Sequence, residues 1–257
     1  MEGRLKVTII TVTFNSAETI KDTLISVANQ SYPLIEHIIV DGNSRDRTLE
    51  IVNNFQSATK IISEPDNGIY DAMNKGIRIA SGDIIGILNS DDFFSSEHVV
   101  EKIVDEFDNE TDAVFGDIAF VRPDDLDKIV RYYSGANWKP DKFKWGYMPP
   151  HPSFYLRKEH YQNLGLYQTD YKIASDYELL IRMLYKYKLR YKYLPKQIVT
   201  MRTGGVSTQN IKSRYVLNKE IIRGCSENGI NTNMFFLSLK YFNKIFEYFR
   251  PAKQAKA

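Results

Sequence analysis

Two adjacent carboxylates, Asp91 and Asp92, follow an apolar run over residues 84–88, and apolar side chains resume at once with Phe93 and Phe94. Two neighbouring carboxylates at the end of a buried strand are costly to hold together unless a positive group lies beside them. Mg²⁺ or Mn²⁺ commonly supplies that charge, because either ion binds one or two carboxylates and fills its other positions with water and substrate phosphates. The pattern therefore predicts a metal-assisted phosphate site. The alternative is a polar turn in which one aspartate caps the next helix.

Predicted strands and helices alternate along the chain up to residue 88, and these elements would position the two carboxylates. Apolar, β-branched segments typical of buried strands alternate with segments whose apolar residues recur at helical spacing. We expect strands over residues 6–13, 36–40, 60–63 and 83–88, and helices over residues 17–29, 46–55 and 69–80. This order predicts an α/β fold with a doubly wound, mostly parallel sheet.

Polar groups suited to a ligand follow three of these strands, at Thr11–Asn15, Asp41–Ser44 and Asn89–Asp92. In parallel sheets ligands bind beyond the carboxyl ends of the strands, so we expect these segments to converge on one cleft. Residues 11–20 contain no glycine-rich phosphate loop, which argues against a dinucleotide dehydrogenase and a P-loop ATPase. A nucleotide bound here would therefore be held by side chains and a metal.

Composition argues against several other classes of protein. The formal net charge is +2 over 257 residues, which does not suit a nucleic-acid binder that works through a broad basic surface. The single cysteine, Cys225, excludes an internal disulfide framework. The N-terminus does not resemble a secretory signal, and no apolar stretch approaches the roughly 18 residues that span a membrane. We expect a cytoplasmic protein, with peripheral contact at the inner face of the cell membrane left open.

The second half carries fewer regular signals. We expect strands over residues 113–121, 128–133, 151–157 and 191–199, and helices over residues 96–107 and 158–164. Residues 134–150 predict an aromatic loop whose Trp138 and Trp145 suit either sugar stacking or a satellite core. Paired glycines within residues 202–207 predict a flexible loop, either a closing lid or a plain turn.

Residues 176–187 predict a helix with Ser175 as its N-cap and Asp176 in its first turn. A carboxylate at that position is stabilised by the free backbone N–H groups of the helix start. Asp176 is therefore either a helix-start acid without chemistry or a functional carboxylate.

The C-terminal part predicts two more helices, over residues 210–227 and 231–250. The second has a stripe of phenylalanines, and residues 231–257 carry a net charge of +4. A basic, aromatic amphipathic helix can lie on anionic lipid, pack on its own domain or join a second copy in a homo-oligomer.

Several motifs in order resemble the inverting family-two glycosyltransferases. The matching segments are TVTFN at 11–15, SVANQSYP at 26–33, DGNS at 41–44, EPDNGIYDAMNKGI at 64–77, NSDD at 89–92 and SDYELLIRM at 175–183. The resemblance covers roughly residues 5–210 and is most specific before residue 100. It implies a GT-A fold over residues 1–209, with a nucleotide-sugar-binding half at 1–95 and an acceptor-binding half at 96–209. Residues 210–257 would form a helical extension.

The resemblance also implies roles for particular residues. Asp176 matches the general base that deprotonates the acceptor hydroxyl. Asp91 and Asp92 match the metal motif for Mn²⁺ or Mg²⁺, with Asp92 expected to coordinate directly. Asp41 is expected to accept the imide N–H of a uracil ring, and Phe14 to pack near the base. The remaining residues expected at the donor are Thr11, Thr13, Asn15, Asn67, Asn74, Asn89, Ser90 and His151.

Two positions depart from the family pattern. Asn89 stands where the metal motif often begins with Asp, so it brings no charge to the ion. Ser175 stands where many members have Glu before the base. His151 is open to a second interpretation, a structural histidine with satisfied hydrogen bonds.

The sequence thus predicts an inverting, metal-dependent transfer of a sugar from a nucleotide-sugar donor, commonly UDP-linked, to a hydroxyl of a glycan or lipid-linked glycan. By resemblance, the reaction would belong to bacterial surface-polysaccharide assembly. A sugar-nucleotide pyrophosphorylase is one alternative, but residues 11–18 lack the glycine- and basic-rich loop that it would need. A nucleotide-sugar-binding protein or an inactive transferase fold is another, and the uncharged Asn89 favours it.

Overall fold

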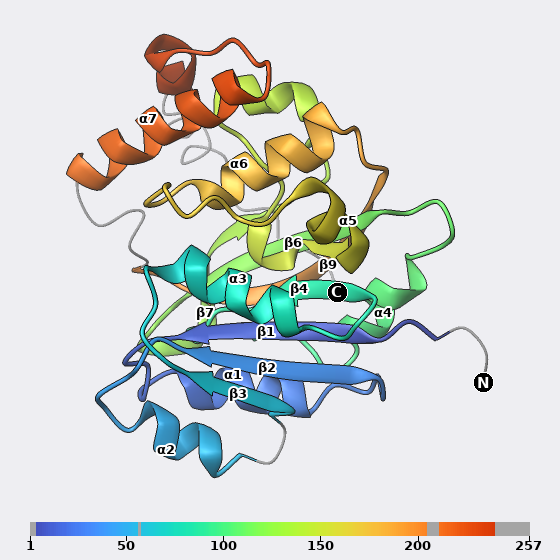
Figure 1. Ribbon diagram of the computed structural model, residues 1–257, viewed down its shortest axis with the longest axis vertical. Coiled ribbons are helices and arrows are strands. Elements are labelled where there is room, and N and C mark those ends of the chain that lie inside the picture. Colours follow the sequence, from blue (N-terminus) through green and yellow to red (C-terminus); the bar gives the residue numbers. More distant parts are fainter. Residues whose placement is uncertain (1–3, 56–57, 205–210, 240–257) are drawn as a thin grey trace.

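One mixed sheet of nine strands runs through the described part of the protein (Figure 1). The computed structural model describes residues 4–55, 58–204 and 211–239. The strand order is β3-β2-β1-β4-β8-β6-β9-β5, with β7 beside β6. The sheet is therefore continuous from the first strand-helix repeats into the second half of the chain.

The predicted parallel, doubly wound half is confirmed. Strands β3, β2, β1 and β4 pair in parallel, and helices α1, α2 and α3 connect them. Their bounds are β1 Val7–Thr13, α1 Ile20–Ala28, β2 Ile35–Asp41, α2 Thr48–Asn53, β3 Lys60–Ser63, α3 Ile69–Ile79 and β4 Ile84–Ile87.

Side chains of alternate strand residues pack into two hydrophobic cores on opposite faces of the sheet. Ile10 and Val12 of β1 belong to the core beneath α3 and α6, whereas Val7 and Ile9 belong to the core that includes α4. The helix α3 lies close to the sheet because Gly76 has no side chain, since a Cβ there would stand 2.5 Å from Ile10 Cγ2. This close approach fixes the position of α3 over β1 and β2.

The second half continues the same sheet through an antiparallel strand. Strand β8 runs antiparallel to β4 and β6, so β6 is parallel to β4, and β9 is parallel to β6. The carboxyl ends of β1, β2, β4, β6 and β9 therefore lie at one edge of the sheet, here called the carboxyl edge. The remaining elements are β5 Asp92–Phe94, α4 Val99–Asp105, β6 Ala113–Arg122, β7 Asp125–Tyr133, η1 Pro140–Trp145, η2 His151–Ser153, β8 Tyr155–Arg157, α5 Lys158–Leu164, α6 Ser175–Ile181, η3 Arg182–Lys186, β9 Tyr191–Arg202 and α7 Ile211–Glu227.

One alternative is excluded and one local prediction is wrong. Asp92 begins the short strand β5, which pairs with β9, so neither aspartate caps the next helix, and α4 instead begins after His98. Ser175 is not an N-cap, because Ala174 holds that position and the buried Ser175 hydroxyl lacks a hydrogen-bond partner among the described residues. The predicted helix over residues 176–187 is an α-helix, α6, that continues as the π-helical turn η3.

The aromatic loop contributes to the core. The Trp138 ring is 8% exposed and packs 5.1 Å from Phe143 and 5.8 Å from Phe115, centroid to centroid. Of the two interpretations of this loop, the satellite core is therefore confirmed for Trp138.

The C-terminal region begins as predicted with α7, which packs on α6 (Figure 1). Residues 234–239 are helical, and Leu237 is fully buried. The rest of the predicted basic helix, from residue 240, and the glycine loop from residue 205 lie outside the described residues. Among the described helices, none is long and apolar enough to cross a membrane.

One buried histidine makes the stability of the fold sensitive to acid. His37 of β2 is 1% exposed, and burial lowers its pKa to about 3. As pH falls below about 6.5, the unfolded chain takes up a proton that the folded protein excludes, so stability declines until the folded pKa is reached. On lowering the pH, we expect the free energy of unfolding of His37→Gln to fall by about 1.4 kcal/mol less per pH unit than that of the wild type. Urea unfolding at pH 7, 6 and 5 measures it, and equal slopes in both proteins would contradict the assignment.

Candidate active site

The loops after β1 and β2 join at the carboxyl edge. Thr13 pairs with Asp41 across the two strands, and Gly42 N–H donates to the Thr13 carbonyl at 2.9 Å. The Asn15 N–H donates to Ser44 Oγ at 2.8 Å. Asn15 itself has a left-handed backbone (φ +50°), a conformation that asparagine tolerates. Beside these bonds the Phe14 ring is 60% exposed, so it is available to a flat ligand.

Asp41 is fully buried beneath this rim. Its Oδ2 accepts the Ser44 N–H at 3.0 Å and the Ser63 hydroxyl at 2.7 Å, and its Oδ1 accepts the Ser44 hydroxyl. A carboxylate has about four acceptor positions, so one remains for a further N–H donor. Gly42 lies directly against Asp66 and Phe14, since a Cβ at Gly42 would lie 2.5 Å from Asp66 Oδ2 and 3.5 Å from Phe14 Cδ2.

The segment after β4 brings both aspartates to the same edge. Ser90 Oγ donates to Ser16 Oγ at 2.8 Å, which ties this segment to the loop after β1. Asp91 is half-buried, whereas Asp92 is 1% exposed and its backbone carbonyl accepts the Thr23 hydroxyl at 2.7 Å. Burial, followed by the charge of Asp91, raises the pKa of Asp92 well above its usual value. The pair therefore favours a cation beside it.

Arg202, at the end of β9, supplies one positive charge that the sequence interpretation missed. Its Nη1 donates to the Asp91 carbonyl at 2.6 Å, and its Nη2 forms an ion pair with Asp22. The guanidinium lies 5.3 Å from the Phe93 ring centroid and acts to lower the pKa of Asp92. The signal in the sequence was an arginine directly after an apolar run, but the predicted strand ended at residue 199 and its direction was unknown.

The residues present fit a hard divalent cation. Asn89 Oδ1 and Asp92 Oδ1 are buried and have no hydrogen-bond partner among the described residues. Both are oxygen donors, as Mg²⁺ and Mn²⁺ prefer. The described residues contain no group of three or more acidic, histidine or cysteine ligands. An ion here would therefore take its other ligands from water and a substrate phosphate.

Asp176 lies in the first turn of α6, beside Tyr70 of α3. Its Oδ1 accepts the Tyr177 N–H at 2.8 Å and lies 3.4 Å from the hydroxyl of Tyr70, in the first turn of α3. Burial, followed by the charge of Asp176, raises the pKa of Tyr70, so the hydroxyl stays protonated. Because α3 follows the carboxyl end of β3, its N-terminus lies at the carboxyl edge. The half-buried Asp176 therefore belongs to the same edge as the two aspartates.

Six of the residues expected at the donor are buried, namely Thr11, Thr13, Asp41, Asn74, Ser90 and His151. Among them, the side chains of Thr11, Asn74 and His151 contact buried groups of the protein. Thr11 is fully buried and its hydroxyl lies 3.0 Å from His37 Nε2. Asn74 is 2% exposed and binds both the carbonyl and the N–H of Tyr167, at 2.8 and 3.0 Å. The expectation that these two side chains contact the donor is therefore corrected, since each is occupied by protein.

His151 is also buried, 2.9 Å from the Tyr167 hydroxyl through Nε2. Burial lowers its pKa, although the charge of Asp176 acts in the opposite direction. These contacts favour the structural interpretation of this histidine.

A cavity of about 480 Å³ opens beside Tyr70. Its walls come from the start of α3 and from the loop before α6, namely Asn67, Gly68, Ile69, Tyr70, Thr169, Asp170, Tyr171 and Lys172. Tyr70 thus connects this cavity to Asp176, and Asn67, a residue expected at the donor, lies on its wall. The cavity is a candidate substrate pocket.

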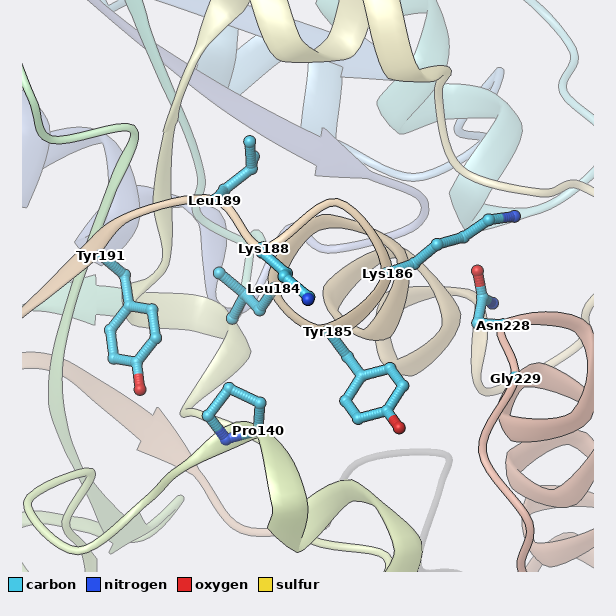
Figure 2. Close-up of a pocket in the computed structure, with 9 residues that line it drawn as sticks. All are labelled: Pro140, Leu184, Tyr185, Lys186, Lys188, Leu189, Tyr191, Asn228 and Gly229. Atoms are coloured by element: carbon cyan, nitrogen blue, oxygen red, sulfur yellow. The ribbon is translucent and has the colours of Figure 1, made fainter.

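A larger cavity, of about 680 Å³, lies at the opposite end of α6 and η3. Figure 2 shows Leu184, Tyr185 and Lys188 at this end of the helix, on the side where Pro140 lies. At ~1.5 Å per residue, Asp176 is on the order of 12 Å away along the helix. This cavity therefore lies apart from the carboxyl edge.

A sequence model described as Glycosyl transferase family 2 matches residues 8–175. The chain belongs to this family. An uncharacterised glycosyltransferase of Mycobacterium tuberculosis is 32% identical over 182 residues, which is 68% of each chain. A PGL/p-HBAD biosynthesis glycosyltransferase of Mycobacterium bovis is 26% identical over 216 residues, 81% of each chain. The protein is therefore a glycosyltransferase.

Solved structures show the same fold as this family-two glycosyltransferase. S. aureus TarS (residues 1–349) in complex with UDP-GlcNAc has a TM-score of 0.62 at 17% identity, over 95% of this chain and 73% of TarS. The mannosyltransferase PcManGT of Pyrobaculum calidifontis, in complex with GDP-Man and Mn²⁺, has a TM-score of 0.57 at 15% identity. That match covers 97% of this chain and 82% of PcManGT. The predicted GT-A fold is confirmed.

The two asparagines expected at the donor give a matched test. Asn74→Ala leaves the buried N–H and carbonyl of Tyr167 unbonded, so we expect the free energy of unfolding to fall by about 2–4 kcal/mol. Asn67 is exposed and lines the cavity, so Asn67→Ala should change stability by less than about 0.5 kcal/mol. Urea unfolding distinguishes the two variants. A stable Asn74→Ala protein that no longer binds nucleotide would show that Asn74 acts at the substrate.

Proposed function

We propose that the protein is an inverting glycosyltransferase that moves one sugar from a nucleoside-diphosphate sugar to a hydroxyl of a glycan or lipid-linked glycan. The observation that carries the proposal is the shared carboxyl edge. Asp91 and Asp92 after β4, Arg202 at the end of β9, and Asp176 beside Tyr70 all lie there. A candidate phosphate-binding group and a candidate base thus lie at the same edge of the sheet.

The donor would occupy the rim formed by the loops after β1 and β2. Phe14 offers an exposed ring for the base, and Asp41 keeps an acceptor position for a ring N–H. The side chains proposed to complete the donor site are those of Thr13, Asn15, Asn67, Asn89 and Ser90. The structures of TarS with UDP-GlcNAc and of PcManGT with GDP-Man support a nucleotide-sugar donor. Uracil and guanine both carry a ring N–H, so the choice between UDP and GDP is decided by measuring the binding of each.

Asp91 and Asp92 would hold a Mn²⁺ or Mg²⁺ ion, with Asn89 Oδ1 beside them. When bound, the ion would offset the charge of the diphosphate and so improve the leaving group. Asp91 is half-buried and Asp92 is 1% exposed, so Asp91 is the more accessible carboxylate. Arg202 adds a fixed positive charge behind the pair. The Mn²⁺ complex of PcManGT supports this part of the proposal.

The reaction would be a single displacement. The acceptor hydroxyl attacks the anomeric carbon from the side opposite the diphosphate, and Asp176 takes the hydroxyl proton. The bond from the anomeric carbon to the diphosphate oxygen breaks, and the nucleoside diphosphate leaves with that electron pair. One bond forms as one breaks, so the configuration at the anomeric carbon inverts and no covalent enzyme intermediate is needed. The cavity beside Tyr70 would receive the acceptor, and Asn67 on its wall would contact both acceptor and donor.

The acceptor class rests on the family and on charge. A related protein is named for the biosynthesis of PGL/p-HBAD, and residues 231–257 of this chain carry a net charge of +4. The name supports a role in biosynthesis, and the basic charge supports action on an acceptor at an anionic membrane surface. On this proposal the protein acts at the cytoplasmic face of the membrane in surface-glycan assembly.

Removal of the base gives the direct test of the proposed chemistry. We expect Asp176→Asn to lower kcat by about 10²–10⁴-fold, because a general base contributes this much, while nucleotide binding stays unchanged. The assay follows release of nucleoside diphosphate from a panel of UDP- and GDP-sugars with Mn²⁺ and a bacterial glycolipid fraction as acceptor. Binding of UDP and GDP is measured by calorimetry on both proteins.

The possible outcomes separate the competing functions. A nucleotide-sugar-binding protein would bind a donor and release no diphosphate. A pyrophosphorylase would form nucleotide sugar from sugar phosphate and nucleoside triphosphate. Full transfer by Asp176→Asn would contradict the role of Asp176.

A further inference from the structure

A glutamate on α7 holds the backbone segment that leads to Asp176. The Glu220 carboxylate accepts the N–H groups of Lys172 at 2.8 Å, Ile173 at 2.8 Å and Ala174 at 3.0 Å. Lys172 uses Oε1, and the other two use Oε2, so both oxygens are engaged. Hydrogen bonds from backbone N–H groups to a charged carboxylate are among the stronger ones in proteins. Without Glu220 these three donors would lose their partner in a region that is partly buried.

The same segment is held from its other side by α3. The Tyr70 hydroxyl donates to the Ile173 carbonyl at 2.5 Å. Ala174 is the N-cap of α6, and Asp176 lies two residues further along. The peptide groups that precede the base are thus fixed by one side chain from α7 and one from α3. Any shift of this segment moves the first turn of α6, and Asp176 with it.

We infer that Glu220 is a positioning residue for Asp176 and that α7 is part of the catalytic apparatus. The inference rests on the proposed role of Asp176 as base. The match to the family model ends at residue 175, so α7 lies outside it. A displacement of about 1 Å at a reacting group can cost on the order of 10²-fold in rate, so a fixed N-terminus of α6 has a large effect on catalysis. Glu220 does this without touching substrate.

Glu220→Gln is the informative change, because it keeps the size of the side chain. An amide has one acceptor oxygen and carries two N–H donors, so it cannot accept all three backbone N–H groups. Glu227→Gln is the matched control on the same helix. Glu227 binds the Tyr171 hydroxyl at 2.7 Å and Arg223 at 2.7 Å, and neither contact involves the backbone of residues 172–174.

The first measurement is hydrogen exchange on the full-length protein without ligand. We expect the amides of residues 172–174 to exchange at least about 10-fold faster in Glu220→Gln than in the wild type. The same amides should exchange at wild-type rates in Glu227→Gln. Unchanged exchange in Glu220→Gln would overturn the inference, whatever the enzyme's substrate proves to be.

The second measurement is a kinetic coupling cycle with UDP-GlcNAc, or with the member of the nucleotide-sugar panel that is turned over fastest. We expect Glu220→Gln to lower kcat by about 10–100-fold and to leave the Kd for the nucleoside diphosphate unchanged. In the Asp176→Asn background the same change should have no further effect, because the group that Glu220 positions is gone.

Three results would contradict the inference in distinguishable ways. An unchanged kcat in Glu220→Gln, with Asp176→Asn inactive, would overturn the role of Glu220 and leave the proposed function standing. An equal loss in both backgrounds would show a general structural effect. Full activity of Asp176→Asn would overturn the base itself, and the positioning role would fall with it.

Discussion

The candidate site depends on one constraint, that the strands of a parallel sheet end on the same side. Strands β1, β2 and β4 follow this rule in the first half of the chain. Strands β6 and β9 extend it, because β8 lies between β4 and β6 in the sheet and is antiparallel to both. Polar side chains at these ends stand together although they are far apart in sequence. Arg202 at the end of β9, for example, forms an ion pair with Asp22 in the first turn of α1, 180 positions earlier. The sheet interior is mostly apolar, although it also holds polar side chains such as Glu36 and His37 of β2.

The electrostatics of this edge explain why a cation suits it. Asp92 is buried next to another carboxylate, and one arginine only partly offsets the resulting rise in its pKa. Asn89 and Asp92 also leave acceptor oxygens without partners among the described residues. A divalent cation would satisfy these oxygens and balance the charge at the same time. The loss of a third acidic residue at Asn89 leaves the site with less negative charge, and Arg202 reduces it further.

Many of the strands, helices and site residues were predictable because local sequence pattern indicates them. The period of apolar residues gave the first four strands and three helices, and Asp41 and the NSDD segment were found by their place after strands. Arg202 was not found, because the direction of β9 depends on its pairing with β6, which no local pattern encodes.

Asn74 was misassigned for a similar reason. Its motif resembles a ligand site, but its amide is used to bind Tyr167 in the second half. Ser175 looked like a cap, yet Glu220, 46 residues after Ala174, takes the N–H groups before the helix. Contacts that a distant element supplies are the ones that sequence reasoning missed.

The central claim is that donor, metal and base meet at the carboxyl edge, and a crystal structure with UDP and Mn²⁺ tests it most directly. The account predicts the base of the nucleotide beside Phe14 and Asp41, and the diphosphate and Mn²⁺ beside Asp91 and Asp92. It also predicts that Asp176 faces the same cleft. Nucleotide bound instead in the larger cavity between Pro140 and Lys188, with the carboxyl edge empty, would contradict the account.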